Sequence, residues 1–400
     1  MPRNMESEIN YNIKHKKILY FIHFFLIYLS LDPWPFWEIK PIINLFLTLV
    51  LLLICLPQNK ILFDKKSNNT IILALYIIII LWNSRFTFTP QIGFNILLFA
   101  LFIYLKDVYK SELLKAFIKY FALINLPSII GWILYLLNIP FPISYNVEYS
   151  VYSYTNYYLY LFNNTFTNLI LPRYSGIIIE PGHMSMICAF LLFINDFNIK
   201  NKYNFIITVC LIFTFSLSGY VIYFIGYLFK KIWIEKRFKL LLNFVIISIT
   251  TIIIAINYNE GENALNKLII SRLEYEDGDI KGNNRNEIGF DEYFKNNIQE
   301  MALLCGIGEE EWSNIPYVNC SYKSYIGGNG IISLGLLTLL YILICCNGIT
   351  IRSKILFFLF AISFLQRPYA LMRYELFTFI LAIDFFKLKE IENQEQNKDI

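Results

Sequence analysis

The chain has 400 residues, of which 56% are hydrophobic and only 16% are charged, and its mean hydropathy is +0.50. These values exclude a soluble domain of this length and predict a polytopic membrane protein. The formal net charge of +4 does not indicate nucleic-acid binding, because the basic residues are sorted between alternate loops instead of forming one patch.

Apolar stretches of near-spanning length recur along the chain. A membrane-spanning helix needs about 20 mostly apolar residues, and a few of these stretches are shorter, as tilted or re-entrant segments would be. The stretches are residues 17–32, 40–57, 70–84, 91–106, 116–138, 175–196, 203–217, 219–234, 239–257, 327–346, 354–366 and 369–386. The predicted fold class is therefore an all-α polytopic membrane protein with about 12 transmembrane helices.

The same pattern predicts the domain organisation. Helices 1–5 occupy residues 1–139, helices 6–9 occupy 175–257, and helices 10–12 with a cytoplasmic tail occupy 327–400. A medium outer loop (140–174) and a large outer loop (258–326) separate the three groups.

Lysine and arginine predict the orientation. With the N-terminus inside, the inner segments hold 23 of the 34 basic residues. Short cytoplasmic loops retain such residues, so both termini are predicted to be cytoplasmic. The first apolar stretch lacks a small-residue cleavage site, which predicts an uncleaved anchor.

The type of basic residue differs between the two sides. Only three of the 23 inner basic residues are arginine, whereas four of the five in short outer segments are: Arg85, Arg173, Arg367 and Arg373. A guanidinium presents a planar fork that binds phosphate or carboxylate through two parallel hydrogen bonds. The outer arginines therefore predict a site for an anionic, lipid-borne group, and contact with lipid headgroups is the simpler alternative.

The stretch PRYSGIIIEPGHMS, residues 172–185, places Arg173, Glu180 and His183 at the start of an apolar run. Ionisable groups at that depth cost several kcal/mol unless they face a polar cavity, so a functional site is the leading hypothesis. The alternative is a structural ion pair between Arg173 and Glu180.

The medium outer loop is rich in tyrosine and asparagine. Aromatic faces and amide groups suit a sugar-binding groove, although an aromatic belt at a membrane interface has the same composition. Both interpretations remain open for this loop.

The large outer loop begins with a charged segment whose apolar spacing predicts an amphipathic helix before Gly278. Arg272 and Arg285 are its candidate binding residues. Gly306 and Gly308 permit a tight turn further along the loop.

The loop ends in CSYKSYIGGNGIISLGLL, whose glycines permit a compact re-entry into the bilayer. Lys323 and Tyr325 lie at the mouth of the tenth span. They are candidate substrate contacts, and a snorkelling lysine with an interfacial tyrosine is the alternative.

Cysteine and histidine give no metal-binding pattern. Five of the seven cysteines lie in predicted spans, and the three histidines are dispersed, so neither a metal nor another cofactor is predicted. Cys305 and Cys320 share the large outer loop. A disulfide between them is left open, because spacing alone does not establish one.

Two motifs carry a resemblance. The pattern R-x-S-G-x-x-x-E-P-G at Arg173–Gly182 resembles the Arg…Glu-Pro signature of bacterial O-antigen and capsule repeat-unit polymerases of the Wzy type. The large outer loop, with its G-x-G turn and its S-Y-I-G-G-x-G-x-x-x-L-G exit, is similar to the large periplasmic loop of that family. The topology resembles the family over nearly the whole chain, and the motifs cover two short stretches.

The resemblance implies a GT-C-like transferase architecture in the bacterial inner membrane. It implies a metal-independent, inverting glycosyl transfer at the periplasmic face. The donor is a glycan on undecaprenyl diphosphate, and the acceptor is a second lipid-linked unit. A chain-length regulator and a flippase are left open as protein partners, and no nucleic acid is expected.

The resemblance and the local chemistry together give each candidate residue a role. Arg173 binds the diphosphate, and Glu180 either orients Arg173, which we favour, or acts as general base, with His183 as the competing base. The further candidate substrate contacts are Arg85, Arg272, Arg285, Lys323, Tyr325, Arg367 and Arg373.

Three rival functions remain. A related O-antigen ligase would carry a histidine before the exit helix, where this chain has Lys323 and Ser324, and its spaced glycine is off by one at Gly335. A lipid-linked oligosaccharide flippase or other transporter would show internal repeats, and none is found. A membrane acyltransferase would need a catalytic histidine, for which His183 is the one candidate.

Overall fold

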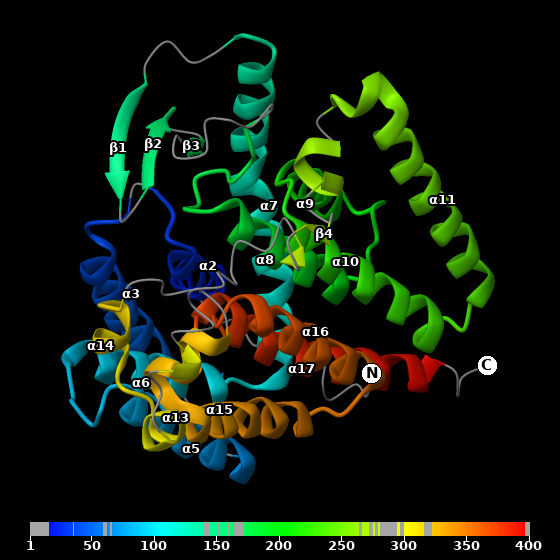
Figure 1. Ribbon diagram of the computed structural model, residues 1–400. Helices are drawn as coiled ribbons and strands as arrows, with labels where there is room; N and C mark the ends of the chain where they lie inside the picture. The colour runs from blue at the N-terminus through cyan, green and yellow to red at the C-terminus, as the bar shows by residue number, and fades with distance from the viewer. Residues whose placement is uncertain are drawn as a thin grey trace. The chain divides into compact units, whose positions relative to one another are not determined.

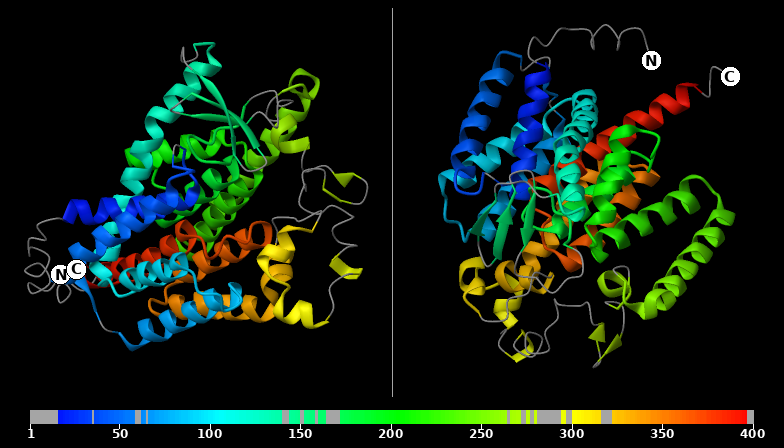
Figure 2. Two further views of the ribbon diagram at one scale, coloured as in Figure 1. Left: turned by 90° about the vertical axis from the view of Figure 1, so that its left-hand side faces the viewer. Right: turned by 90° about the horizontal axis from the view of Figure 1, so that it is seen from above.

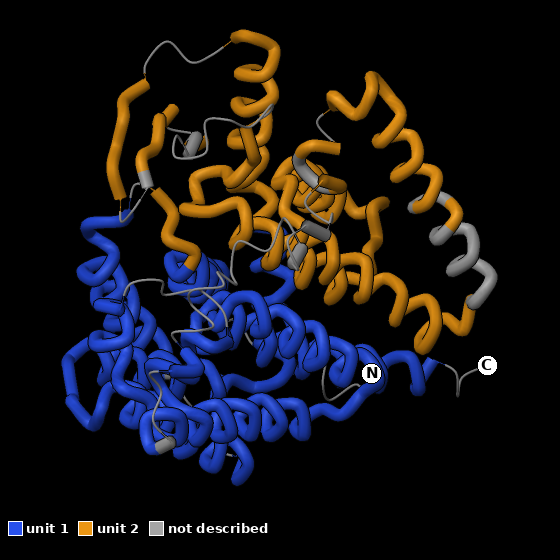
Figure 3. The backbone as a smooth tube through the Cα atoms, viewed as in Figure 1, with its two compact units in different colours: residues 1–30, 35–120, 294–400 blue, residues 31–34, 121–293 orange. Residues whose placement is uncertain are grey.

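A computed structural model describes residues 16–396, apart from 35, 59–61, 65, 140–143, 150–151, 158–159, 164–171, 264–265, 272–274, 277–278, 281–293, 297–299 and 316–321. The chain is mostly helical and divides into two compact units. Unit 1 comprises residues 1–30, 35–120 and 294–400, and unit 2 comprises 31–34 and 121–293 (Figures 1 and 3).

Unit 1 is built from helices of both ends of the chain, which lie side by side in the left view of Figure 2. Its longer helices are α2 (Lys16–Tyr28), α3 (Lys40–Cys55), α5 (Ser67–Asn83), α6 (Pro90–Ile103), the first part of α7 (Asp107–Leu136), α15 (Tyr322–Cys346), α16 (Ile351–Gln366) and α17 (Arg373–Gln396). Its short helices are η1 (Leu29–Leu31), η2 (Leu56–Gln58), α13 (Glu300–Cys305) and α14 (Glu309–Ser313).

Unit 2 combines helices with short strands. Its helical elements are the rest of α7, α8 (Pro181–Ile194), α9 (Lys202–Phe213), α10 (Leu217–Phe229), η4 (Lys230–Ile234), α11 (Phe238–Asn257), η5 (Tyr258–Gly261) and η6 (Asn266–Ile270). Its strands are β1 (Tyr145–Tyr149), β2 (Tyr152–Asn156), β3 (Leu161–Asn163), β4 (Tyr275–Glu276) and β5 (Asp279–Ile280). β1, β2 and β3 form an antiparallel sheet in that order, and β4 pairs with β5.

Each unit contains one helix that is buried on all sides. In unit 2, every residue of α8 from Gly182 to Ile194 is buried. In unit 1, α17 is buried from Tyr374 to Asp384 and contacts α2, α15 and α16. α8 is apolar around nearly its whole circumference, as expected of a helix in the centre of a bundle, whereas the buried run of α17 also encloses Glu375 and Asp384.

The twelve predicted apolar stretches each coincide with a helix among the described residues: α2, α3, α5 to α11 and α15 to α17. By length and composition, α7 and α15 are long and apolar enough to cross a membrane, and five shorter apolar helices occur in the described part of the chain. Helix positions are thus confirmed, whereas spanning by all twelve stays a prediction.

The helix predicted from residue 175 begins later, at Pro181. Gly176 adopts a left-handed backbone with φ of +62°, and Ile178 forms a β-bridge with Pro33. Glu180 is extended (φ −138°, ψ 140°), as expected of a residue that precedes proline. The Pro-Gly pair therefore starts the helix, because proline is well suited to a first helical position.

The amphipathic helix predicted before Gly278 was wrong for the described residues. Among its described residues, the region before Gly278 contains the short turns η5 and η6, the second of them a five-residue π-helical turn, and the two-residue strand β4, which pairs with β5 just beyond it. The prediction used apolar spacing alone, while Asn and Asp side chains in this segment compete with the backbone for hydrogen bonds. The medium outer loop also departs from an all-α fold, since it forms the three-stranded sheet.

Candidate functional site

The loops of unit 1 gather at two opposite ends of its helices. At one end, residues that follow α5 contact α13 and α15, and the start of α17 contacts α2, α3 and α6. At the other end, Lys66 before α5 contacts Asp107 at the start of α7, and Lys387 of α17 contacts the same aspartate. Asn68 in the first turn of α5 contacts Asn347 in the turn between α15 and α16. The segments of unit 1 predicted to be outer thus lie at one end of its helices, and those predicted to be inner lie at the other. We call the first the arginine end, after Arg85, Arg367 and Arg373, and the second the lysine end, after Lys66, Lys110 and Lys387.

Arg373 lies at the first position of α17, at the arginine end. Its Nη1 donates to the Asn44 side-chain oxygen at 2.8 Å and to the Leu26 carbonyl at 3.3 Å, and its Nη2 donates to the Asn95 side-chain oxygen at 3.1 Å. These acceptors come from three different helices and all are neutral. Arg373 forms no ion pair with any described residue. Hydrogen bonds therefore fix the guanidinium in place, but no described carboxylate neutralises its charge.

Arg367 lies in the turn between α16 and α17 and is buried, with 8% of its surface exposed. Its Nη1 donates to the Tyr369 hydroxyl at 3.0 Å, and its guanidinium carbon lies 5.6 Å from the centre of that ring. The Tyr341 hydroxyl donates to the Ala370 carbonyl and anchors the turn. The turn therefore fixes a second guanidinium near the start of α17.

Arg85 has a different environment from the other two. It lies in the turn after α5 with φ of +54°, and its side chain donates to the carbonyls of Cys305 (3.1 Å) and Gly328 (3.4 Å). Both acceptors are backbone groups, so Arg85 fastens the α13–α14 loop to the start of α15. Its predicted role as a substrate contact stays a prediction.

The predicted close turn at Gly306 and Gly308 is confirmed. The amides of Ile307 and Gly308 donate to the carbonyls of Gly327 and Gly328 at 2.9 and 2.8 Å. A Cβ on Gly306 would lie 2.4 Å from the Gly328 carbonyl oxygen, which no ordinary contact allows. The glycines at 306 and 308 and at 327 and 328 therefore allow two backbone segments of the large outer loop to come into direct contact.

Side chains from the same loop reinforce this contact. Glu309 accepts from the Asn329 amide at 3.0 Å, and the Trp312 indole donates to Ser324 at 2.8 Å. Tyr325 is buried, and its hydroxyl contacts Ser333 at 2.8 Å.

Two of these placements bear on the predicted contacts at the tenth span. Asn83 donates to the Tyr325 hydroxyl, so this hydroxyl is already engaged in packing. Lys323 is half-buried on the first turn of α15. Substrate contact by either residue stays a prediction.

The candidate catalytic residues from the sequence lie in unit 2. Arg173 is half-buried, and its Nε donates to the Thr214 carbonyl at 2.9 Å. Glu180 is the N-cap of α8, and its carbonyl accepts from the Met184 amide. His183 is buried in the first turn of α8, at 4% exposure. Their roles remain as predicted from the sequence.

The structure does not test whether the four outer arginines form one cluster. Arg85, Arg367 and Arg373 belong to unit 1 and Arg173 belongs to unit 2. Arg272 and Arg285 lie outside the described residues, as does Cys320, the predicted disulfide partner of Cys305.

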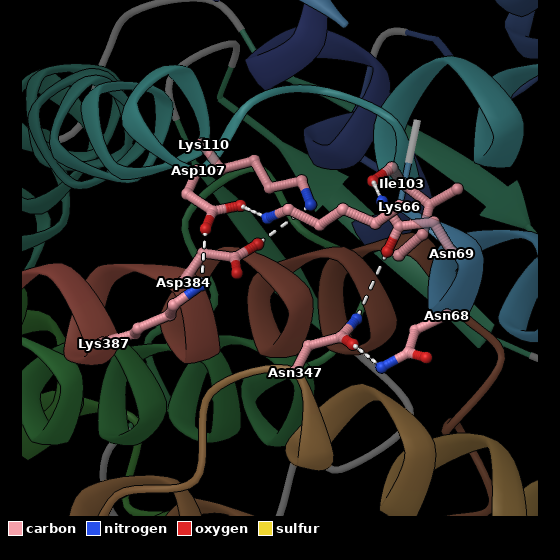
Figure 4. Close-up of polar contacts among 9 residues, drawn as sticks. All are labelled: Lys66, Asn68, Asn69, Ile103, Asp107, Lys110, Asn347, Asp384 and Lys387. Atoms are coloured by element: carbon pink, nitrogen blue, oxygen red, sulfur yellow. Dashed lines mark hydrogen bonds and ion pairs between the residues drawn. The ribbon is translucent and has the colours of Figure 1, made fainter. Parts of the chain in front are cut away.

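The lysine end pairs its charges. Lys66 and Lys387 contact the two carboxylate oxygens of Asp107 at 2.5 and 2.9 Å, and Lys110 contacts Asp384 at 2.9 Å (Figure 4). The side chains of Lys110 and Asp384 are only 2% and 6% exposed. These lysines therefore have carboxylate partners within the protein, which the outer arginines Arg85 and Arg373 lack among the described residues.

Sequence reasoning missed Glu375, which lies two residues after Arg373 and is 1% exposed. It also missed the buried pair of Lys110 and Asp384. The signal was available, because an ionisable residue inside an apolar run is by itself a functional hypothesis. We applied that rule to Glu180 but not to the last apolar stretch.

Across the described part of the chain, no group of three or more His, Cys, Asp or Glu side chains is arranged to hold a metal ion. Comparisons with protein-family models, with curated proteins and with solved structures found no match.

Proposed function

We propose that this chain polymerises oligosaccharide repeat units carried on undecaprenyl diphosphate, at the periplasmic face of the bacterial inner membrane. In this proposal the twelve apolar helices cross the membrane, both termini are cytoplasmic, and the arginine end faces the periplasm. The enzyme is a metal-independent, inverting glycosyltransferase of O-antigen or capsule type.

The observation that carries the proposal is the coordination of Arg373. Three neutral acceptors from α2, α3 and α6 hold its guanidinium, and it forms no ion pair with a described residue. A partly buried cation without a counter-charge is costly unless an anion binds, so this arrangement favours an anionic ligand. A diphosphate suits it, since guanidinium forks match phosphate oxygens.

The chemistry needs such a cation. The bond between the anomeric carbon and the diphosphate oxygen breaks, and its electron pair stays on the diphosphate. A new bond forms between the anomeric carbon and the acceptor hydroxyl oxygen, which loses its proton to a base. Fixed guanidinium groups stabilise the charge that develops on the leaving diphosphate. We assign this role to Arg373 and Arg367 in unit 1.

The sorting of charges supports the same orientation. Lys66, Lys110 and Lys387 of the predicted inner segments pair with Asp107 or Asp384. Arg85 and Arg373 of the predicted outer segments are held by neutral oxygens of the described residues. An inner face needs stable packing near anionic lipid, and an outer face that handles a lipid diphosphate needs positive charge.

The topology is tested by labelling single cysteines from outside the inner membrane. Positions 150 and 285 are expected to react with a membrane-impermeant maleimide, and positions 66 and 236 are expected to react only after permeabilisation. The reverse pattern would contradict the orientation.

The function is tested by deleting the gene and examining surface polysaccharide on a gel. A polymerase predicts loss of the long ladder with one repeat retained on the lipid core. Long glycan accumulating on undecaprenyl diphosphate would instead indicate a ligase, and single units trapped in the inner leaflet would indicate a flippase. Either of the latter results would refute the proposal.

A further inference from the structure

Glu375 is a buried carboxylate at the start of the central helix of unit 1. It lies in the first turn of α17 and is 1% exposed. Neither of its carboxylate oxygens forms a hydrogen bond with a described residue. Buried polar atoms are almost always hydrogen-bonded, so a carboxylate that forms no hydrogen bond of ordinary geometry with the described residues needs an explanation.

The surroundings of Glu375 belong to the arginine end. The guanidinium of Arg367 acts on the carboxylate electrostatically, and Glu375 acts in the same way on Tyr341. The side chain of Tyr374 lies near enough to be a hydrogen-bonding neighbour of the carboxylate, although no bond between them has ordinary hydrogen-bond geometry. Arg373, two residues earlier, directs its hydrogen bonds to other helices. Glu375 therefore lies near the guanidinium of Arg367 but forms no ion pair with a described residue.

This placement differs from that of the other buried carboxylate of α17. Asp384 lies at the lysine end and forms an ion pair with Lys110 at 2.9 Å. The same helix thus carries a paired acid near its middle and, in its first turn, an acid whose oxygens form no hydrogen bond of ordinary geometry with the described residues. The pairing gives Asp384 a structural role, and oxygens without such a bond leave Glu375 able to accept a proton.

We propose that Glu375 is the general base of the glycosyl transfer, an inference that rests on the proposed function. Its carboxylate accepts the proton of the acceptor sugar hydroxyl as that oxygen bonds to the anomeric carbon. The electron pair of the broken bond leaves with the diphosphate, which Arg367 and Arg373 stabilise. The hydroxyl donates the hydrogen bond that Glu375 otherwise lacks, and such catalytic contacts are often completed only in the substrate complex.

The proposal leaves Glu180, the carboxylate selected from the sequence, in its orienting role. Glu180 is an N-cap in unit 2, and sequence reasoning favoured it as an orienting partner for Arg173. Glu375 supplies the base that this assignment left open. The two carboxylates are separable, because each can be replaced alone.

The test compares purified Glu375→Gln with wild-type protein. The substrate is the lipid-linked oligosaccharide extracted from the deletion strain, and the readouts are polymer formation, binding of undecaprenyl diphosphate and thermal unfolding. A general base contributes about 10²- to 10⁴-fold, so Glu375→Gln is expected to lower turnover by at least about 100-fold with donor binding kept. Glu375→Asp should lose about 10-fold, because its shorter side chain keeps the carboxylate.

Thr378→Val is the matched control. Thr378 is fully buried on the same helix, one turn beyond Glu375, and its hydroxyl also has no hydrogen-bond partner among the described residues. Valine removes that hydroxyl at nearly constant volume, so turnover is expected to stay within about threefold. A general packing effect would instead lower both variants together and would contradict the base role.

Three results overturn the inference. Turnover of Glu375→Gln within about threefold of wild type removes the base role while leaving the polymerase proposal intact. Loss of undecaprenyl diphosphate binding in the same variant shows a structural or binding role. A matching loss in Glu180→Gln, with Glu375→Gln active, identifies Glu180 as the base. Wild-type protein that fails to polymerise the extract counts against the proposed function itself.

Discussion

The arginine end and the lysine end of unit 1 handle positive charge in opposite ways. At the lysine end, Lys66, Lys110 and Lys387 each contact an aspartate at 2.5 to 2.9 Å. At the arginine end, Arg85 and Arg373 are held only by carbonyl and amide oxygens among the described residues. The first arrangement cancels charge, and the second fixes charge in position without cancelling it.

This difference separates structural from functional charge. A paired buried lysine contributes to which fold forms, and its removal leaves an uncompensated partner. An arginine with neutral partners keeps its field available to a ligand. The comparison predicts that replacements at the lysine end alter stability, whereas replacements at the arginine end alter ligand binding and turnover.

The largest expected effect is the loss of one member of the buried pair Lys110–Asp384. Lys110→Met leaves Asp384 buried without its partner, which costs about 3–5 kcal/mol of unfolding free energy. The double variant Lys110→Met with Asp384→Leu should recover most of that loss, because an apolar pair avoids desolvating two ions. Unfolding in mixed detergent measures both, and equal instability of the single and double variants would contradict the pairing.

The next largest effect is expected from Arg373→Lys. An ammonium cannot reach three acceptors on three helices, so we expect turnover on lipid-linked substrate to fall by about 100-fold, about 2.7 kcal/mol of transition-state stabilisation. Lys387→Arg at the lysine end is the control, since arginine can still contact Asp107 and activity should stay within about twofold. Similar losses of turnover in Arg373→Lys and Lys387→Arg would contradict the prediction that only the arginine end acts on the substrate.

The smallest effect concerns Glu235, an inner residue of unit 2 between η4 and α11. Burial raises the pKa of its carboxyl, but hydrogen bonds from Lys231 and Lys230 and their charges outweigh burial, so the pKa lies below its usual value. A lowered folded pKa stabilises the protein above the unfolded pKa of about 4.3, and this stability is lost as pH falls through the folded pKa.

The variant Glu235→Gln measures that contribution. It should lower the free energy of unfolding at pH 7 by less than about 1 kcal/mol. The difference from wild type should shrink as pH falls below the unfolded pKa of about 4.3 and vanish once pH is below the folded pKa. A constant difference across that range would show that the effect comes from packing and not from the ion pairs.

Helix positions were predictable because apolar length alone indicates them. The sequence also indicated a turn at Gly306 and Gly308, and both residues adopt positive φ. Their close approach to Gly327 and Gly328 became visible only in the structure. The sequence prediction failed before Gly278, where apolar spacing suggested an amphipathic helix but the described residues form the short turn η6 and the strand β4. It also failed for Glu375, because nothing in the local sequence says whether a carboxylate finds a partner on another helix.

The amino-acid sequence by itself determined the helical, apolar character of this protein and the alternation of lysine-rich and arginine-bearing segments, because both follow from composition along the chain. Only the tertiary structure decided which cations are neutralised. Asp107 pairs with residues 41 and 280 positions away, and Arg373 reaches Asn44 across 329 positions. Hydrogen bonds and ion pairs depend on distances of a few ångströms between helices, and these distances are fixed by packing.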